Sequence, residues 1–120
     1  MYALNFYSEY YEEALRTGRK TVTIRLGDKT DKYKAGMIVW VTIGPRFGKR
    51  QKLFTAILDR VEVKTIDALS PREIQKENPE FRSVDDVVAL LRRIYSSDIS
   101  VEDTVTVVHF SPIEEYPLPT

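Results

Sequence analysis

Hydrophobic residues recur along this chain with two spacings, and each spacing predicts a different element. Between residues 7 and 15 they fall three or four positions apart, which is typical of a helix, and Gly18 follows as a C-terminal stop signal. Between residues 21 and 26 polar and hydrophobic residues alternate, which indicates a strand. We therefore expect one face of this strand to line the core and the other to display Thr21, Thr23 and Arg25.

The remaining elements are predicted in the same way. Two apolar stretches, 38–43 and 53–63, flank the polar loop GPRFGKRQK and predict a pair of strands. Ser70, Pro71 and Glu73 form the start signature of a helix, which should end before Pro79. A second helix is predicted after residue 83 and a closing strand over 104–110. Strands interleaved with short helices predict an α+β fold, a small, strongly curved β-barrel with helices packed on its outside.

Length and composition indicate one folded domain. The chain has 120 residues, of which 42% are hydrophobic and 30% charged. No apolar run approaches the roughly 18 residues of a membrane span, and the N-terminus lacks the pattern of a signal peptide. We expect a single cytoplasmic domain over residues 1–120, without membrane contact and with a peripheral tail from about residue 112. Cysteine is absent and His109 is the one histidine, so we expect neither a metal site nor a cofactor.

Charge is distributed unevenly along the chain. Residues 1–60 contain 12 Lys and Arg against 6 Asp and Glu, and residues 61–120 contain 6 against 12. Between residues 16 and 52, 11 basic residues face only Asp28 and Asp31. Such a block attracts anions, and phosphate backbones are the usual ligands. The alternative, that the basic half pairs with the acidic half across the fold, stays open.

Hydrogen-bond donors are concentrated in the segment 18–25. Arg19 and Lys20 lie at the turn before the strand, and the polar strand face then adds two threonine hydroxyls and a guanidinium. These groups suit a phosphate, a carboxylate or a base edge. An edge strand with a threonine-rich solvent face has the same pattern, so periodicity alone favours neither interpretation.

The same segment resembles the GxKxxxxR signature of the ASCH domain, a family related in fold to the PUA RNA-binding domains. Gly18, Lys20 and Arg25 occupy the three fixed positions. The similarity continues through residues 33–39 and, further along, through the Glu-Asn pair at 77–78, and it spans about residues 6–110. The resemblance implies a single ASCH-like domain, a PUA-like barrel with a cleft beside the signature, and a role in RNA or nucleotide recognition.

One branch of that family consists of small bacterial amidohydrolases that remove the acetyl group from N4-acetylcytidine. Matched residue by residue, their site corresponds to Lys20, Thr23 and Glu77. In these roles Thr23 would attack the acetyl carbonyl, Lys20 would take its proton, and Glu77 would protonate the leaving nitrogen. A lysine base needs a lowered pKa, which Arg19 or Arg25 and partial burial would provide. Because strand residues three apart face opposite sides, Lys20 should lie in the preceding turn, or a bulge should redirect it.

Other residues have weaker patterns. The loop with Arg46, Phe47, Lys49 and Arg50 combines cations with an aromatic ring, as surfaces that stack bases and contact phosphates do, although a solvated hairpin tip fits equally. This loop and the C-terminal tail are longer than in the amidohydrolase branch, which would reshape the cleft toward polymeric RNA.

Three further features are assigned structural roles. Trp40 is expected in the core or the barrel wall, Tyr10 and Tyr11 in the core, and His109 in a structural position.

Two functions of different classes therefore stay open. The first is an RNA-binding module without turnover, and the second is an amidohydrolase acting on N4-acetylcytidine. Both need RNA or a modified nucleoside as the partner. The expected nucleic-acid contacts are Arg19, Lys20, Thr21, Arg25, Arg46, Lys49 and Arg50.

Overall fold

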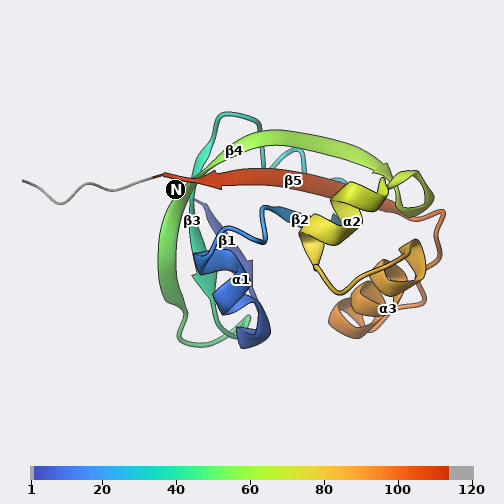
Figure 1. Cartoon of the computed structure of the whole chain (residues 1–120), viewed down its shortest axis with the longest axis horizontal. Coiled ribbons are helices and arrows are strands. Elements are labelled where there is room, and N and C mark those ends of the chain that lie inside the picture. Colours follow the sequence, from blue (N-terminus) through green and yellow to red (C-terminus); the bar gives the residue numbers. More distant parts are fainter. Residues whose placement is uncertain (1, 114–120) are drawn as a thin grey trace, which may run out of the picture.

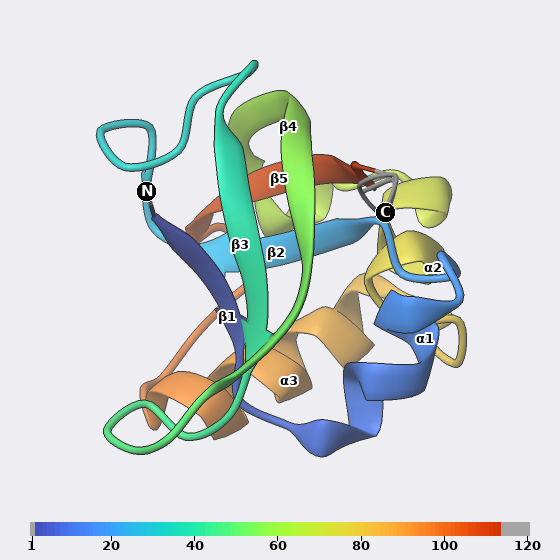
Figure 2. The same cartoon turned by 90° about the vertical axis from the view of Figure 1, so that its left-hand side faces the viewer.

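The computed structural model describes residues 2–113. Within that range five strands form one strongly curled sheet, and three α-helices pack against its outside (Figures 1 and 2). The strand order is β1-β3-β4-β5-β2; β1 runs parallel to β3, and the other neighbours are antiparallel. The predicted α+β barrel with outer helices is thereby confirmed. The strands are β1 (Ala3–Phe6), β2 (Val22–Leu26), β3 (Ile38–Ile43), β4 (Gln51–Thr65) and β5 (Thr104–Pro112).

Strand β4 belongs to both halves of the barrel. Its residues 51–57 pair with β3, and its residues 56–65 pair with β5. A register shift between Leu58 and Arg60 leaves Asp59 as an extra residue, and such a bulge bends a strand. The curved path of β4 from β3 to the far end of β5 is visible in Figure 1.

The first helical segment lies between β1 and β2. A 3-10 turn, η1 (Glu9–Tyr11), leads into α1 (Glu12–Arg16), and together they occupy the predicted helical segment. Ser8 accepts a hydrogen bond from the Tyr10 N–H at the start. Gly18 follows with a φ of +76°, a conformation that favours glycine and turns the chain toward β2.

The later helices begin at the predicted positions, each with a capping box. Ser70 and Glu73 cap α2 (Pro71–Glu77), which ends before Pro79, and Ser83 caps α3 (Val84–Tyr95). A short 3-10 turn, η2 (Ile66–Ala68), connects β4 to α2.

Two clusters of buried apolar side chains hold these elements together. The first fills the barrel between β1, β3, β4, β5 and α1, and the second lies between β2, β5, α2 and α3. Val22 and Ile24 belong to the second cluster, and Leu26 is packed against it, as predicted for the inner face of this strand. The opposite face of β2, with Thr23 and Arg25, is therefore left for other contacts.

Strand β1 is not among the elements predicted from the sequence. Leu4 and Phe6 point into the barrel, while Asn5 on the outer side donates to the Gly44 carbonyl and accepts from the Thr42 hydroxyl. Four residues are too few for a clear alternation, and the parallel pairing with β3 fixes this strand.

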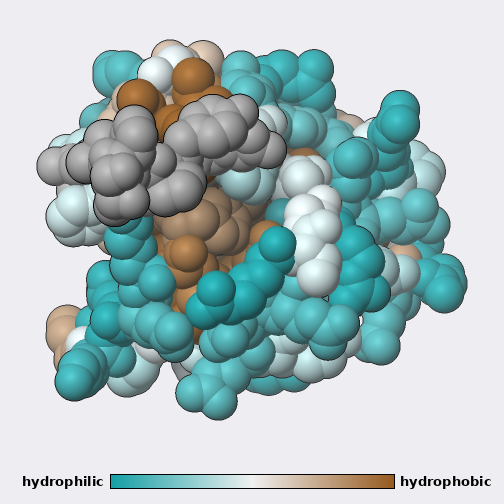
Figure 3. Space-filling model, turned by 60° about the vertical axis from the view of Figure 1, so that its left-hand side comes forward, coloured by the Kyte–Doolittle hydropathy of each residue, from teal (hydrophilic) through white to brown (hydrophobic). Residues whose placement is uncertain are grey.

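Of the two positions expected for Trp40, the structure shows the barrel wall and not the core. Trp40 is 44% exposed on the outer side of β3, next to Ile38 at 46%, whereas Val39 and Val41 are fully buried. Exposed and buried residues therefore alternate over residues 38–41, and Trp40 lies on the solvent side; past the register shift between Val41 and Thr42 the remaining residues of β3 are buried. The view that brings β3 and β4 forward shows an apolar patch bordered by hydrophilic side chains (Figure 3).

The C-terminal end of the described chain remains in the sheet. Pro112 pairs with Ala56, and the Ile113 N–H donates to the Thr55 carbonyl. The tail expected from about residue 112 otherwise lies outside the described residues. Among residues 2–113 no helix has the length and apolar character required to cross a membrane.

Candidate functional site

Lys20 is the most deeply buried polar residue of the signature. It lies in the turn between α1 and β2, as strand geometry requires, and is 1% exposed. Its Nζ donates to the carbonyl oxygens of Val22 (2.8 Å) and Glu77 (2.5 Å) and lies 2.9 Å from Glu77 Oε1. The three protons of the ammonium group thus have three acceptors, and the rings of Tyr11 and Phe6 lie 4.7 and 5.5 Å away.

Glu77 connects this ammonium group to the strand. Its carboxylate is also buried, and Oε2 accepts a 2.7 Å hydrogen bond from the Ile24 N–H. One carboxylate at the end of α2 therefore binds both the turn before β2 and the backbone of β2. Breaking such a buried pair leaves an uncompensated charge, which is costly.

Burial is the main influence on the pKa of Lys20, and it lowers that pKa. The Glu77 carboxylate opposes the shift, and the Arg25 cation adds to it. From the sequence we expected Arg19 or Arg25, together with partial burial, to lower the pKa of Lys20. Burial is complete instead, and Arg19 points elsewhere, forming an exposed ion pair with Glu13 at 3.2 Å.

Thr23 and Arg25 lie side by side on β2. Thr23 is 4% exposed, and its Oγ1 accepts a 3.1 Å hydrogen bond from Arg25 Nε. The Arg25 guanidinium also donates to the Asn5 carbonyl at 2.9 Å and lies 5.1 Å from the centre of the Phe6 ring. The threonine hydroxyl keeps its proton available for a further acceptor.

A cavity of about 530 Å³ opens beside these residues, and we call it the Thr23 cavity. Thr23, Arg25 and Glu77 line it, whereas Lys20 lies behind the lining. No hydrogen bond between Lys20 and Thr23 occurs within residues 2–113. Of the three predicted catalytic residues, the structure thus places two on the cavity and one beneath it. The other walls come from β1, η1, the segment 78–81 and α3, with Asn5, Phe6, Tyr7, Ser8, Tyr10, Tyr11, Ile24, Asn78, Glu80, Phe81, Leu90, Arg93, Ile94 and Tyr95.

Two tyrosines at this cavity were not recognised as site residues. Tyr11 is buried as expected, and its hydroxyl accepts from Asn78 Nδ2 at 3.3 Å. Burial, with the nearby Glu77 carboxylate, raises the pKa of Tyr11 to about 12. Tyr10, expected in the core, is 59% exposed and donates to Glu80 Oε2 at 2.7 Å. Helical spacing predicts which residues share a face, and it carries no signal for these hydroxyl contacts.

The other predicted nucleic-acid contacts are dispersed. Thr21 lies before the start of β2, so the alternation does not extend to it, and it lines a different groove from Thr23. Arg46, Lys49 and Arg50 lie in the exposed loop between β3 and β4. Phe47 in that loop is 90% exposed, with the Arg46 guanidinium 5.3 Å from its ring centre.

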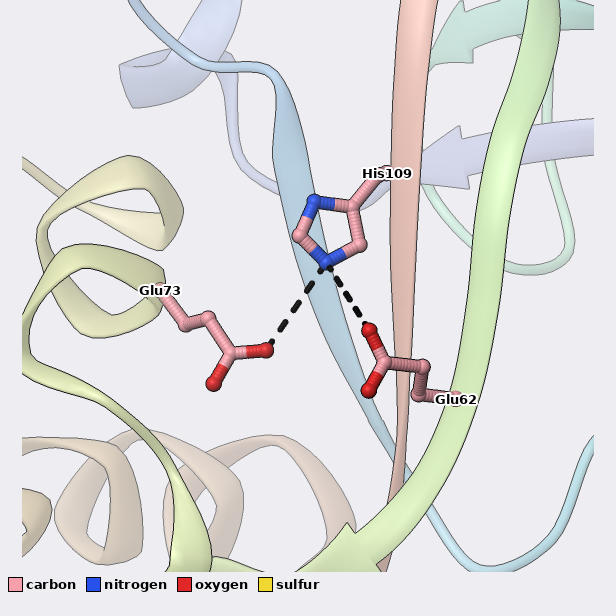
Figure 4. A group of neighbouring side chains, drawn as sticks. All are labelled: Glu62, Glu73 and His109. Carbon is pink, nitrogen blue, oxygen red and sulfur yellow. Dashed lines mark ion pairs between the residues drawn. The ribbon is translucent and has the colours of Figure 1, made fainter.

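A second group of titratable side chains lies between β4, β5 and α2. Three side chains, those of Glu62, Glu73 and His109, each offer one carboxylate oxygen or ring nitrogen, and these atoms lie within 4.8 Å of one another (Figure 4). Lys64 Nζ lies 3.1 and 3.2 Å from the two Glu73 oxygens and 3.5 Å from Glu62 Oε2. An ammonium group therefore already pairs with both carboxylates, which disfavours a divalent cation here.

The comparisons with known proteins rest on structure. No protein-family model and no curated protein sequence matches this chain. The crystal structure of an ASCH domain from Lactobacillus crispatus JV V101 is similar with a TM-score of 0.66 and 12% identity, over 92% of this chain and 77% of that one. Protein EF3133 from Enterococcus faecalis V583, of family DUF984, has a TM-score of 0.67 and 16% identity, over 92% and 74%. The hypothetical protein PH0355 has a TM-score of 0.67 and 21% identity, over 93% and 98%.

Proposed function

Because this chain has an ASCH-type, PUA-like fold, we propose that its Thr23 cavity recognises a nucleoside, either free or as part of RNA. The observation that carries the proposal is the combination of Thr23, Arg25 and Glu77 at one wall of an aromatic-lined cavity of about 530 Å³. That volume falls in the range of small-molecule sites, roughly 300–1,000 Å³. A guanidinium, a hydroxyl and aromatic rings match a base, which offers acceptors at its edge and a face for stacking.

The test is direct binding. We would titrate cytidine, N4-acetylcytidine, uridine and adenosine into the protein and follow amide resonances by NMR. Saturable shifts confined to residues around the Thr23 cavity are the expected result. No shift with any nucleoside, and none with a short single-stranded RNA, would overturn nucleoside recognition.

Hydrolysis of N4-acetylcytidine is the second candidate, and the position of Thr23 and Glu77 on one cavity favours it. In this proposal Thr23 Oγ1 attacks the acetyl carbonyl, its proton passes to a neutral Lys20 amine, and a protonated Glu77 donates to N4 as the C–N bond breaks. Water then hydrolyses the threonine ester and releases acetate. Transfer of one proton from Lys20 to Glu77 across their 2.9 Å contact would produce the neutral amine and the acid together.

The reaction makes one structural demand. In the described residues Lys20 Nζ is hydrogen-bonded to three other acceptors and not to the Thr23 hydroxyl. To take the proton of Thr23, it must give up one of these three contacts. The deciding measurement is conversion of N4-acetylcytidine to cytidine and acetate by the purified protein, followed by chromatography. Nucleoside binding without turnover would leave the non-catalytic RNA-binding module as the function.

A further inference from the structure

A second concave surface lies apart from the Thr23 cavity, between α2 and the β4–β5 pair, and we call it the His109 groove. It has a volume of about 830 Å³. We propose that the His109 groove binds a phosphate group, as carried by a nucleotide or an RNA backbone. Its lining residues are Thr21, Asp59, Arg60, Lys64, Ser70, Arg72, Glu73, Lys76, His109, Phe110 and Ser111, and it shares none of them with the Thr23 cavity.

Two cations of the groove have no counter-charge. Arg72 and Lys76 lie one helical turn apart on α2, and both line the groove. Within residues 2–113 neither side chain forms a hydrogen bond or an ion pair. The Thr21 hydroxyl, which also lines the groove, is likewise without a partner in this part of the chain. A guanidinium, an ammonium group and a hydroxyl around one hollow are the donor set that binds phosphate oxygens.

The acidic residues of the groove are already engaged. Glu73 forms an ion pair with Lys64 at 3.1 Å, and Glu62, which lies beside the groove without lining it, forms one with Arg60. The Asp59 carboxylate accepts a 2.5 Å hydrogen bond from the Ser111 hydroxyl. Asp59 keeps its charge, but the groove holds four cations, Arg60, Lys64, Arg72 and Lys76, against the Asp59 and Glu73 carboxylates of its lining and the adjacent Glu62. The excess of positive charge favours an anion.

His109 adds a further donor at the floor of the groove. Its Nε2 lies 3.4 Å from Arg60 Nη2, which can only donate, so the neutral ring carries its proton on Nδ1. Figure 4 shows the second ring nitrogen turned away from Glu62 and Glu73, whose oxygens lie 3.9 and 3.7 Å from Nε2. Burial and the Arg60 cation lower the pKa of His109, and the Glu73 and Glu62 carboxylates oppose the shift. A phosphate bound beside the ring would favour the imidazolium form and raise this pKa.

The single histidine makes the test specific to this groove. We would label the histidine with ¹³C, record its imidazole resonances, and titrate inorganic phosphate, uridine 5′-monophosphate, unphosphorylated uridine and a short oligouridylate at constant ionic strength. We expect a saturable shift and a raised His109 pKa with the three phosphate-bearing ligands and no change with uridine. An oligouridylate that binds tighter than the mononucleotide identifies the RNA backbone as the source, and equal affinities identify a terminal phosphate.

The matched variants separate a specific site from general attraction. Arg72→Gln with Lys76→Gln should weaken phosphate binding by roughly tenfold or more, because two charge-assisted contacts are lost. Lys32→Gln with Lys34→Gln removes the same charge from exposed positions outside the groove and should leave binding unchanged. No saturable phosphate effect on His109, or equal weakening in both double variants, would overturn the proposal. Nucleoside shifts at the Thr23 cavity are read from other resonances, so the two proposals fail independently.

Discussion

Lys20 and Glu77, 57 residues apart in the sequence, form an ion pair of 2.9 Å with both side chains almost completely buried. The pair joins the turn before β2 to the last residue of α2, and the Thr23 cavity lies directly above it. Its two members are therefore needed for the shape of the cavity before any role in catalysis is considered.

The first prediction concerns this pair and stability. Lys20→Met should lower the free energy of unfolding by about 3–5 kcal/mol, because it leaves the Glu77 carboxylate buried without its counter-charge. Lys20→Met combined with Glu77→Gln should recover part of that loss. The control is Arg16→Met, which breaks the exposed ion pair with Glu12 and should cost under about 1 kcal/mol. Urea unfolding of the four proteins measures the differences, and equal stabilities for the Lys20 and Arg16 variants would contradict the structural role.

The second prediction concerns the nucleophile. Thr23→Ala should abolish conversion of N4-acetylcytidine, and Thr23→Ser should retain part of the rate because the hydroxyl remains. Glu77→Gln should reduce the rate by about 100-fold or more, and Lys20→Arg should be nearly as damaging as Thr23→Ala, because a guanidinium does not lose its proton. Since these two variants also disturb a buried pair, their unfolding curves must be measured alongside. Thr30→Ala, at an exposed position outside the cavity, is the control. Full activity of Thr23→Ala would remove Thr23 as the nucleophile.

The third prediction concerns Arg25. Arg25→Lys keeps the charge and loses the planar fork that contacts Thr23 and the Asn5 carbonyl, so nucleoside affinity should fall by roughly tenfold. Arg16→Lys makes the same exchange at an exposed position outside the cavity and should have no effect. Calorimetric titration with the best-binding nucleoside compares the two. An unchanged affinity for Arg25→Lys would show that Arg25 has only a structural role in its contacts with Thr23, Asn5 and Phe6.

The fourth prediction concerns polymeric RNA and salt. If the loop between β3 and β4 contacts phosphates, RNA affinity should fall steeply with ionic strength, with about −0.7 in the log–log slope for each phosphate neutralised on a single strand. Changing Arg46, Lys49 and Arg50 together to Ala should flatten that slope. Replacing three basic residues elsewhere in the basic half, Arg16, Lys29 and Lys34, should flatten it less. Salt-independent affinity of the unmodified protein would leave small nucleosides as the ligands.

The fifth prediction concerns pH. The pKa of His109 is lower in the folded protein than its usual value of about 6.5, so the unfolded chain binds more protons near that pH. Stability should therefore rise as the pH increases through the interval between the folded value and about 6.5. His109→Gln should remove this part of the pH dependence and leave that of the carboxylates. Urea unfolding of both proteins between pH 5 and 8 measures the difference, and parallel curves would contradict it.

Local signals in the sequence predict most of the fold. The capping box of Ser70 and Glu73, the glycine at residue 18 and the alternation along β2 each act within a few neighbouring residues, so they are readable without the fold. Strand β1 fails this criterion because its pairing partner lies about 37 residues further on. For Trp40 the local pattern is incomplete in another way. Alternation along β3 separates two faces of the strand, but it does not show which face is packed against the core.

The site is predictable only in part, for a related reason. The predicted site residues Thr23, Arg25 and Glu77 do line one cavity, but the complete burial of Lys20 depends on how α2 packs on β2. The His109 groove depends on the bulge at Asp59, which shifts the register so that Arg60 lies opposite His109. Neither the bulge nor the packing leaves a pattern in the sequence.

The shared strand β4 has a consequence for how the molecule opens. Because residues 51–57 complete one half of the barrel and residues 56–65 complete the other, neither half retains its full set of backbone hydrogen bonds once this strand is released. The two halves are thus joined into a single cooperative unit, and partial opening should be restricted to elements outside it, such as the β3–β4 loop. Amide protons of β4 should accordingly exchange with solvent only through unfolding of the whole domain.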